Sequence, residues 1–180
     1  TQSFGTGDIV NNASLVLNET TDASFATLIS GTGSLTKTGA GSLTLTGANS
    51  FSGGTTISAG SLIGNTQNFG TGAIVNNASL VLDQTTDASF AGGISGTGSL
   101  TKTGAGALTL TGVSSFTDTT TISAGSLIGS SQSLGRGAIV NNASLVFDQS
   151  TAGSFAGAIS GAGSLTKTGA GALTLTGANS

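Results

Sequence analysis

Apolar and polar residues alternate in short runs along this chain, and glycine, asparagine or serine separates each run from the next. Residues 42–46 alternate strictly as Ser-Leu-Thr-Leu-Thr, and residues 14–17, 24–26 and 55–58 form similar runs. A period of two is typical of strands with one buried face. Apolar residues do not recur at helical spacing over three turns, and glycine at this density disfavours helices. The pattern therefore predicts an all-β chain.

The whole pattern repeats with a 65-residue period. The segment that begins at Thr1 returns at Thr66 and again at Ser131, and the third copy reaches Ser180, the counterpart of Ser50. We divide the chain into repeats 1–65 and 66–130 and a shorter third repeat, 131–180, of one continuous structure. Such self-similarity is typical of stacked arrays, whose natural ends are atypical capping units. We therefore expect this chain to be a portion of a longer polypeptide.

A shorter period lies inside each repeat. The dipeptide Ser-Leu recurs at gaps of 20, 27 and 18 positions, which together make up one repeat and average about 22. This spacing predicts a parallel β-solenoid with about 22 residues per turn and three turns per repeat. Turns about 4.8 Å apart would give one repeat a length of roughly 14 Å and the chain roughly 40 Å. The dipeptides begin at Ser14, Ser34, Ser61, Ser79, Ser99, Ser126, Ser144 and Ser164.

Three whole turns per repeat would place equivalent residues above one another. We expect Phe25, Phe90 and Phe155 in one interior column and Phe51 and Phe116 in another, with smaller apolar residues on the turns between them. Glycine and asparagine accept positive φ and make tight corners. The Asn pairs are expected at corners, with hydrogen bonds along the axis; they are Asn11-Asn12, Asn76-Asn77 and Asn141-Asn142.

Charged residues are scarce, which excludes several function classes. They make up 6% of the chain, which carries four basic residues and a net charge of −3. Binding of nucleic acid or anionic lipid needs clustered Lys and Arg, so we predict no nucleic-acid partner. No apolar stretch approaches the roughly 18 residues of a membrane span, and no signal segment opens the chain. Membrane contact is therefore expected only through parts of the polypeptide outside this chain.

The sequence carries no constellation of residues typical of an active site. It lacks His and Cys, which removes most nucleophile–base pairs and transition-metal sites. The Gly-Gly-x-Gly-x-Asp arrays of calcium-binding β-rolls are also absent. Since the acidic residues are scattered, we predict no catalytic residue, no cofactor, no metal ligand, no small-molecule substrate and no enzyme activity. The acidic residues are Asp8, Glu19, Asp22, Asp83, Asp87, Asp118 and Asp148.

Two recurring polar features invite specific interpretations. Lys37, Lys102 and Lys167 share a predicted strand face with leucines, and a buried ammonium is costly unless it is paired. Each lysine would reach water or carbonyl groups at a strand end, guard a strand edge against aggregation, or cross-link to an Asn or Asp of a neighbouring turn. Thr-x-Thr pairs on every turn of one face would bind ice, but the clear pairs recur on one predicted turn in three; they are Thr44/Thr46, Thr109/Thr111 and Thr174/Thr176.

Residues 31–62, GTGSLTKTGAGSLTLTGANSFSGGTTISAGSL, closely resemble the autotransporter-associated β-strand repeat. The motif recurs at residues 96–127 and, shortened, at 161–180. The resemblance implies a right-handed parallel β-helix from the passenger domain of a type V secreted bacterial protein, exported through the outer membrane and exposed at the cell surface. One departure is Phe116-Thr117-Asp118-Thr119 in place of Phe51-Ser52-Gly53-Gly54, which implies a corner with a different backbone.

These observations predict a structural β-solenoid segment of a secreted bacterial surface protein. Its expected role is the stalk or scaffold of an autotransporter-like adhesin, with a ligand on a host or neighbouring cell as the candidate partner. The alternative is a subunit of a self-assembling extracellular filament or biofilm-matrix fibre, because exposed strand edges invite head-to-tail association.

Overall fold

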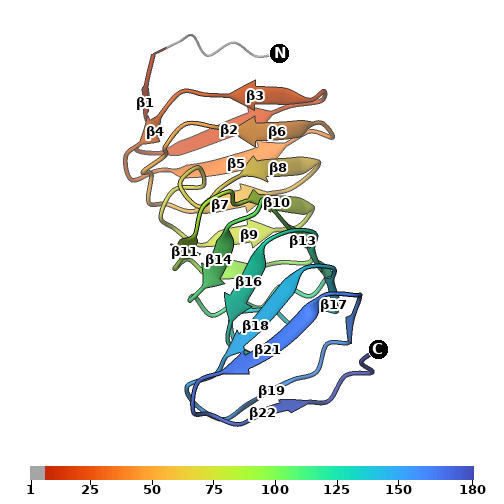
Figure 1. Ribbon diagram of the computed structural model, residues 1–180. Helices are drawn as coiled ribbons and strands as arrows, with labels where there is room; N and C mark the ends of the chain where they lie inside the picture. The colour runs from red at the N-terminus through yellow and green to blue at the C-terminus, as the bar shows by residue number, and fades with distance from the viewer. Residues whose placement is uncertain (1–6) are drawn as a thin grey trace.

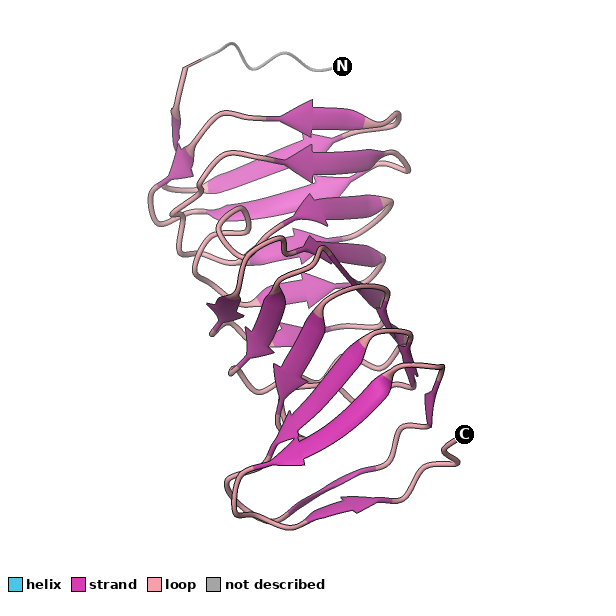
Figure 2. Ribbon diagram, viewed as in Figure 1, coloured by secondary structure: helices cyan, strands magenta, loops and turns pink. Residues whose placement is uncertain are grey.

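The computed structural model describes residues 7–180 as one parallel β-solenoid of about eight turns. Within this range the chain forms twenty-two short strands and no helix, and the strands stack turn upon turn between the two ends (Figures 1 and 2). Paired strands run parallel throughout, as in β2·β5 and β10·β13. The prediction of an all-β parallel solenoid is confirmed.

Each turn has three sides, called sides 1, 2 and 3 in the order in which the chain visits them. Strands on the same side of successive turns pair into parallel sheets along the molecule. Side 3 is one continuous sheet of eight strands. These strands are β3 (Ala23–Phe25), β6 (Ser42–Leu45), β8 (Ser61–Gly64), β10 (Ser79–Asp83), β13 (Ser99–Thr103), β15 (Thr120–Ile122), β17 (Ile139–Asn141) and β20 (Ile159–Ser160).

Sides 1 and 2 are each interrupted by irregular segments that keep the turn-to-turn hydrogen bonding. On side 1, Ser50 N donates to Ile29 O at 2.9 Å and Thr71 N to Phe51 O at 3.0 Å, so the hydrogen bonding continues beyond β4 for two further turns. Side 1 holds β1 (Ile9–Val10), β4 (Ile29–Ser30), β11 (Ala88–Phe90), β14 (Ala107–Leu110), β16 (Ser126–Gly129), β18 (Ser144–Asp148) and β21 (Ser164–Thr168). Side 2 holds β2 (Ser14–Asn18), β5 (Ser34–Thr38), β7 (Thr55–Ile57), β9 (Ile74–Asn76), β12 (Ile94–Ser95), β19 (Gly153–Phe155) and β22 (Leu173–Leu175).

The turn is shorter than the predicted length of about 22 residues. Residues that pair across one turn lie closer together in the sequence than that, as in Ser61↔Ser79 and Ser14↔Ser34. The repeat also does not contain a whole number of turns. Three turns lead from Leu15 through Leu35 and Thr55 to Ile74, all on side 2, whereas the next copy of Leu15 is Leu80 on side 3. The segment from Ile74 to Leu80 forms one further side, so one repeat makes about three and one third turns.

The longest Ser-Leu interval is the reason for the difference. The chain between Ser34 and Ser61 completes a turn from β5 to β7 on side 2 and then moves on to β8 on side 3. This interval is therefore not one long turn, as the spacing predicted, but a turn and a change of side.

Equivalent residues of successive repeats consequently lie on different sides, and the predicted phenylalanine columns are wrong. Phe25 lies on β3 of side 3, Phe90 on β11 of side 1 and Phe155 on β19 of side 2. Phe51 and Phe116 are likewise separated, on sides 1 and 2. Each repeat is rotated by one third of a turn relative to the one before it.

The interior columns are instead built from different positions of the repeat. On side 3, Leu43, Leu62, Leu80 and Leu100 stack in register and are at most 1% exposed. Strand residues alternate between this interior and the surface, as the period of two requires. Burial of each such leucine stabilises the fold by about 1.5–3 kcal/mol.

The corners are made by asparagine and glycine, as predicted. Asn11 Nδ2 donates to Ser34 O at 2.9 Å, and Asn12 Oδ1 accepts a hydrogen bond from Thr32 N at 3.2 Å, both on the next turn. The corresponding bonds from Asn76 and Asn141 measure 2.8 Å each, so the expected axial bonding of these corners is confirmed.

The corner at residues 116–119, whose sequence differs from that of residues 51–54, has a different backbone, as expected. Gly54 has a φ of +87°, whereas its counterpart Thr119 has a negative φ, because only glycines among residues 7–180 have positive φ. Asp118 Oδ1 accepts a hydrogen bond from Thr119 N at 2.7 Å and holds the altered corner.

We expect Gly96→Ala to destabilise the solenoid by about 1–3 kcal/mol. Gly96 has a φ of +108°, and an added Cβ would overlap the carbonyl oxygen of Asn76 on the preceding turn. Gly7→Ala is the control, since no atom of the described part of the chain lies within 4 Å of the place that its Cβ would take. Urea unfolding followed by circular dichroism measures both variants, and equal stabilities would contradict this account of the corners.

Candidate functional site

The most unusual chemical feature of the interior is a buried ammonium group on two turns. Lys37 is 0% exposed, and its Nζ donates to Thr38 O at 2.8 Å, Gly39 O at 2.8 Å and Ala59 O at 3.2 Å. Three donors therefore meet three backbone acceptors, which satisfies the hydrogen-bonding capacity of an ammonium.

Lys102 reproduces this arrangement in the second repeat, on another side. It is also 0% exposed, and its Nζ donates to Thr103 O at 2.6 Å, Gly104 O at 2.8 Å and Ala124 O at 3.2 Å. Lys167 lies on the last stacked turn, is exposed, and donates to Gly169 O.

The local sequence explains how a lysine occupies an interior column. Lys37 stacks between Leu17 and Ile57 with its alkyl stem inward. Its ammonium reaches the corner, where a Cβ on Gly60 would lie 2.9 Å from Nζ, so a glycine is needed there. Of the three interpretations of the lysines, the structure supports contact with carbonyl groups: the partners of Nζ are backbone oxygens, not a side-chain amide or carboxylate.

Burial perturbs these ammonium groups. Desolvation lowers the pKa of Lys37 below its usual value, and the charge of Glu19 opposes this shift. Desolvation also lowers the pKa of Lys102, and there Asp83 supplies the opposing charge. A group that gives up its proton more readily in the folded than in the unfolded state makes stability depend on pH.

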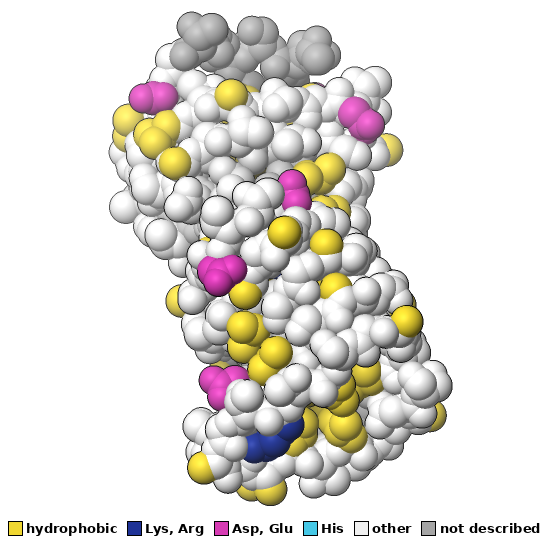
Figure 3. Space-filling view, viewed as in Figure 1, with side chains coloured by type: hydrophobic (Ala, Val, Ile, Leu, Met, Phe, Trp, Pro, Cys, Tyr) yellow, Lys and Arg dark blue, Asp and Glu magenta, His cyan; other side chains and the backbone are white. Residues whose placement is uncertain are grey.

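The acidic residues tie turns together at separate places on the surface. Asp22 Oδ1 accepts a hydrogen bond from Ser42 N at 2.8 Å, which lowers the pKa of Asp22, and Asp87 accepts one from Ala107 N at 2.8 Å. Figure 3 shows the acidic side chains of the visible face as isolated patches. Residues 7–180 contain no group of three or more acidic, histidine or cysteine side chains able to hold a metal ion. The structure therefore does not bring the acidic residues into one site.

A buried amide at the repeat junctions is a feature that the sequence analysis missed. Gln149 is 3% exposed; its Oε1 accepts from Ser131 N and its Nε2 donates to Ser131 Oγ, both at 2.9 Å. In the repeat before it, Gln84 Oε1 accepts a hydrogen bond from Thr66 N at 3.1 Å. The sequence did carry a signal for this feature, because every repeat has a carboxamide or a carboxylate at this position, Glu19 in the first repeat.

The threonine pairs do not form a regular array. Thr44 lies on side 3, and the outward column that contains it continues through Ile63, Val81 and Thr101. Thr109 lies on side 1 and Thr174 on side 2, because each repeat is rotated by one side. Since ice binding needs threonines on successive turns of one face, the structure does not support that interpretation.

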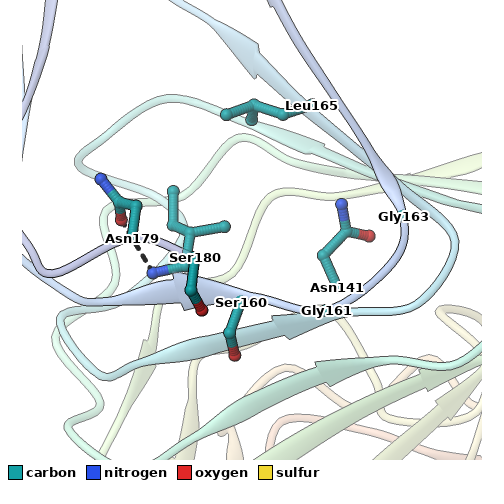
Figure 4. Close-up of a pocket in the computed structure, with 8 residues that line it drawn as sticks. Asn141, Ser160, Gly161, Gly163, Leu165, Asn179 and Ser180 are labelled. Atoms are coloured by element: carbon teal, nitrogen blue, oxygen red, sulfur yellow. Dashed lines mark hydrogen bonds between the residues drawn. The ribbon is translucent and has the colours of Figure 1, made fainter.

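The surface of the described residues carries several small hollows. The one in Figure 4 has a volume of about 300 Å³ and lies beside the last turn, where Ile159 N donates to Asn179 Oδ1 at 2.9 Å. Leu165, on its rim, is 46% exposed, whereas its counterparts Leu35 and Leu100 are 0% exposed. Residues 7–180 also contain no helix able to span a membrane.

Three segments of the chain match a family model, at residues 35–63, 100–128 and 165–180, and the family is described as the passenger-associated-transport-repeat. These three segments are similar to the passenger repeat. The first match begins in β5, ends in β8 and includes Lys37, so the lysine-bearing turn is part of the passenger repeat. The suspected resemblance is confirmed, and the family implies a secreted or cell-surface protein. Neither the curated proteins nor the solved structures gave a match.

We expect Lys102→Met to lower the free energy of unfolding by about 1–3 kcal/mol, because the carbonyl groups of Gly104 and Ala124 lose the Nζ donor, while Thr103 O keeps the bond from Gln84 N. Lys167→Met is the matched control at the same position of the passenger repeat, where the side chain is exposed. Its effect should stay within about 0.5 kcal/mol. Urea titration of both variants tests this difference, and equal losses would refute a role for the carbonyl cluster.

The free energy of unfolding is expected to rise with pH between the lowered folded-state pKa of Lys37 and Lys102 and the usual value of 10.5. In this window the unfolded chain binds more protons than the folded chain, so deprotonation favours folding. Urea midpoints over this pH range measure the slope. The double variant Lys37→Met, Lys102→Met should show a smaller slope, and an unchanged slope would exclude the buried lysines as its cause.

Proposed function

We propose that this passenger-type segment acts as a rigid stalk that sets the distance between a cell surface and the parts of the protein displayed beyond it. The observation that carries the proposal is the continuous turn-to-turn register from β1 to β22, which crosses both repeat junctions. At about 4.8 Å per turn, each repeat adds roughly 16 Å of length.

The rotation of successive repeats favours a scaffold over a surface with one binding face. Because each repeat turns by one side, any given surface residue of the repeat appears on each of the three sides in turn, as β2, β10 and β18 do on sides 2, 3 and 1. Three repeats, which make ten turns, bring a feature back to its starting side. A stalk built in this way is similar on all sides and resists bending equally in each direction.

The same proposal includes a location and a set of partners. We place the parent protein at the bacterial cell surface as an adhesin, with a ligand on a host or neighbouring cell. The scattered acids and the scarcity of exposed basic side chains favour a non-enzymatic segment with no nucleic-acid partner. Membrane contact belongs, on this proposal, to other parts of the polypeptide.

A self-assembling filament is the second candidate, because a solenoid whose strands pair in parallel from turn to turn can pair in the same way with a second copy. Electron microscopy of the purified chain separates the two candidates, since the filament requires polymers and the stalk requires single rods.

Deletion of residues 66–130 should shorten the rod by one repeat without disturbing its fold. Spin labels at Ser24→Cys and Ser154→Cys report the length, because the chain has no cysteine of its own and both positions are exposed. The labels lie on two different sides before and after the deletion, so the distance change is axial. We expect the axial separation to fall from roughly 32 Å to roughly 16 Å. An unchanged distance, or loss of the β signal in circular dichroism, would contradict the proposed stalk.

A further inference from the structure

The junction between the second and third repeats differs from the rest of the chain in sequence. Val113 occupies the position of Ala48 and Ala178, and Arg136 occupies the position of Thr71. The backbone brings these two stretches together on consecutive turns: Ser114 N donates to Gln132 O at 2.8 Å and Arg136 N to Phe116 O at 2.9 Å. Two residues that differ from their counterparts in the other repeats, and that lie far apart in the sequence, therefore form one surface.

That surface contains a pocket of about 340 Å³, lined by Val113, Ser114, Ser131, Gln132 and Arg136. Ser114 and Ser131 are smaller than their counterparts Asn49 and Thr66, whereas Val113 and Arg136 are larger than Ala48 and Thr71. At the first junction, Asn49 stands in place of Ser114, accepting from Ile29 N at 2.8 Å and donating to Asn68 O. Ser114 keeps only the first of these roles, accepting from Ile94 N at 3.1 Å. The volume lies within the range of sites for small ligands, about 300–1,000 Å³.

The pocket presents hydrogen-bond donors and no carboxylate. The guanidinium of Arg136 is exposed and has no hydrogen-bond or ion-pair partner in residues 7–180. Ser131 Oγ accepts from Gln149 Nε2 at 2.9 Å, so its own hydrogen is free to donate outward. The nearby Asp118 carboxylate is turned to Thr119 N and does not line the pocket.

We propose that this pocket binds the carboxylate of a ligand of monosaccharide size. The planar guanidinium of Arg136 pairs with a carboxylate through two parallel hydrogen bonds, and the Ser131 hydroxyl adds a third donor. Val113, which is 73% exposed, offers an apolar wall to the C–H groups of a ring. The ligand class is thus an acidic sugar or a compound of similar size and charge.

The single arginine of the chain makes the proposal directly measurable. In the ¹⁵N-labelled chain, the Nε–H resonance of Arg136 is a unique reporter, and D-glucuronate is the probe. Titration with D-glucuronate at constant ionic strength should shift this resonance in a saturable way. D-Glucose, which has a similar ring but no carboxylate, should shift it at least tenfold less at equal concentration.

Two variants distinguish binding by the pocket from binding by an isolated arginine charge. Arg136→Thr restores the residue of the first junction, so the fold is retained, and saturable shifts of the neighbouring Gln132 and Ser131 amides should disappear. The double variant Arg136→Thr, Thr71→Arg moves the only arginine to the junction where Asn49 and Thr66 replace Ser114 and Ser131, and its affinity for glucuronate should be at least tenfold weaker. Equal binding by the relocated arginine, an equal response to glucose, or no saturable shift in the unmodified chain would each overturn the proposal.

Discussion

The whole structure depends on the backbone ladder between successive turns. Each strand pairs in parallel with the strand one turn away, as Ser61 does with Ser79, so every inward side chain stacks on a residue of the turn before it. The corners must follow the same spacing, and carbonyl groups of one turn approach the next turn closely. Glycine is therefore required at positions such as Gly31, where any side chain would overlap Asn11 O. Each hydrogen bond contributes only about 1 kcal/mol, but the ladder is continuous.

The mismatch between the repeat and the turn shapes the surface of the molecule. Since one repeat makes about three and one third turns, its strands β2, β10 and β18 lie on three different sides. Interior columns consequently mix positions of the repeat, and each position must tolerate different neighbours. A small residue is needed where a polar side chain enters such a column. Gly64 leaves room for Asn68, whose Oδ1 accepts a hydrogen bond from Asn65 N at 2.7 Å. The rotation also prevents a regular threonine face and spreads the aspartates apart.

The interior is not uniformly apolar, because the corners leave carbonyl groups that need donors. Lys37 and Lys102 supply these donors from within a leucine-rich column. Gln84 and Gln149 instead accept hydrogen bonds from backbone N–H groups of the junction loops, Thr66 N and Ser131 N. No described buried side-chain nitrogen or oxygen lacks a partner. Polar side chains inside the coil thus hold the corners in one conformation, which suits a segment whose proposed role is to keep its shape. The junction with Val113 and Arg136 is different, since the guanidinium of Arg136 is exposed at the surface.

The amino-acid sequence by itself determined the fold class and the corners. Alternation at residues 42–46, the long repeat period and the Asn11-Asn12 corner are local or repetitive signals, and each has one structural solution. The length of the turn was decided only by the tertiary structure, because a Ser-Leu gap cannot show whether the chain has completed a turn or moved one side further. For the same reason three features were not predictable: the columns of Phe25 and Phe90, which carbonyl groups Lys37 contacts, and the meeting of Val113 with Arg136. All of these depend on which turn lies on which, and that follows from strand pairing between parts of the chain that are far apart in sequence.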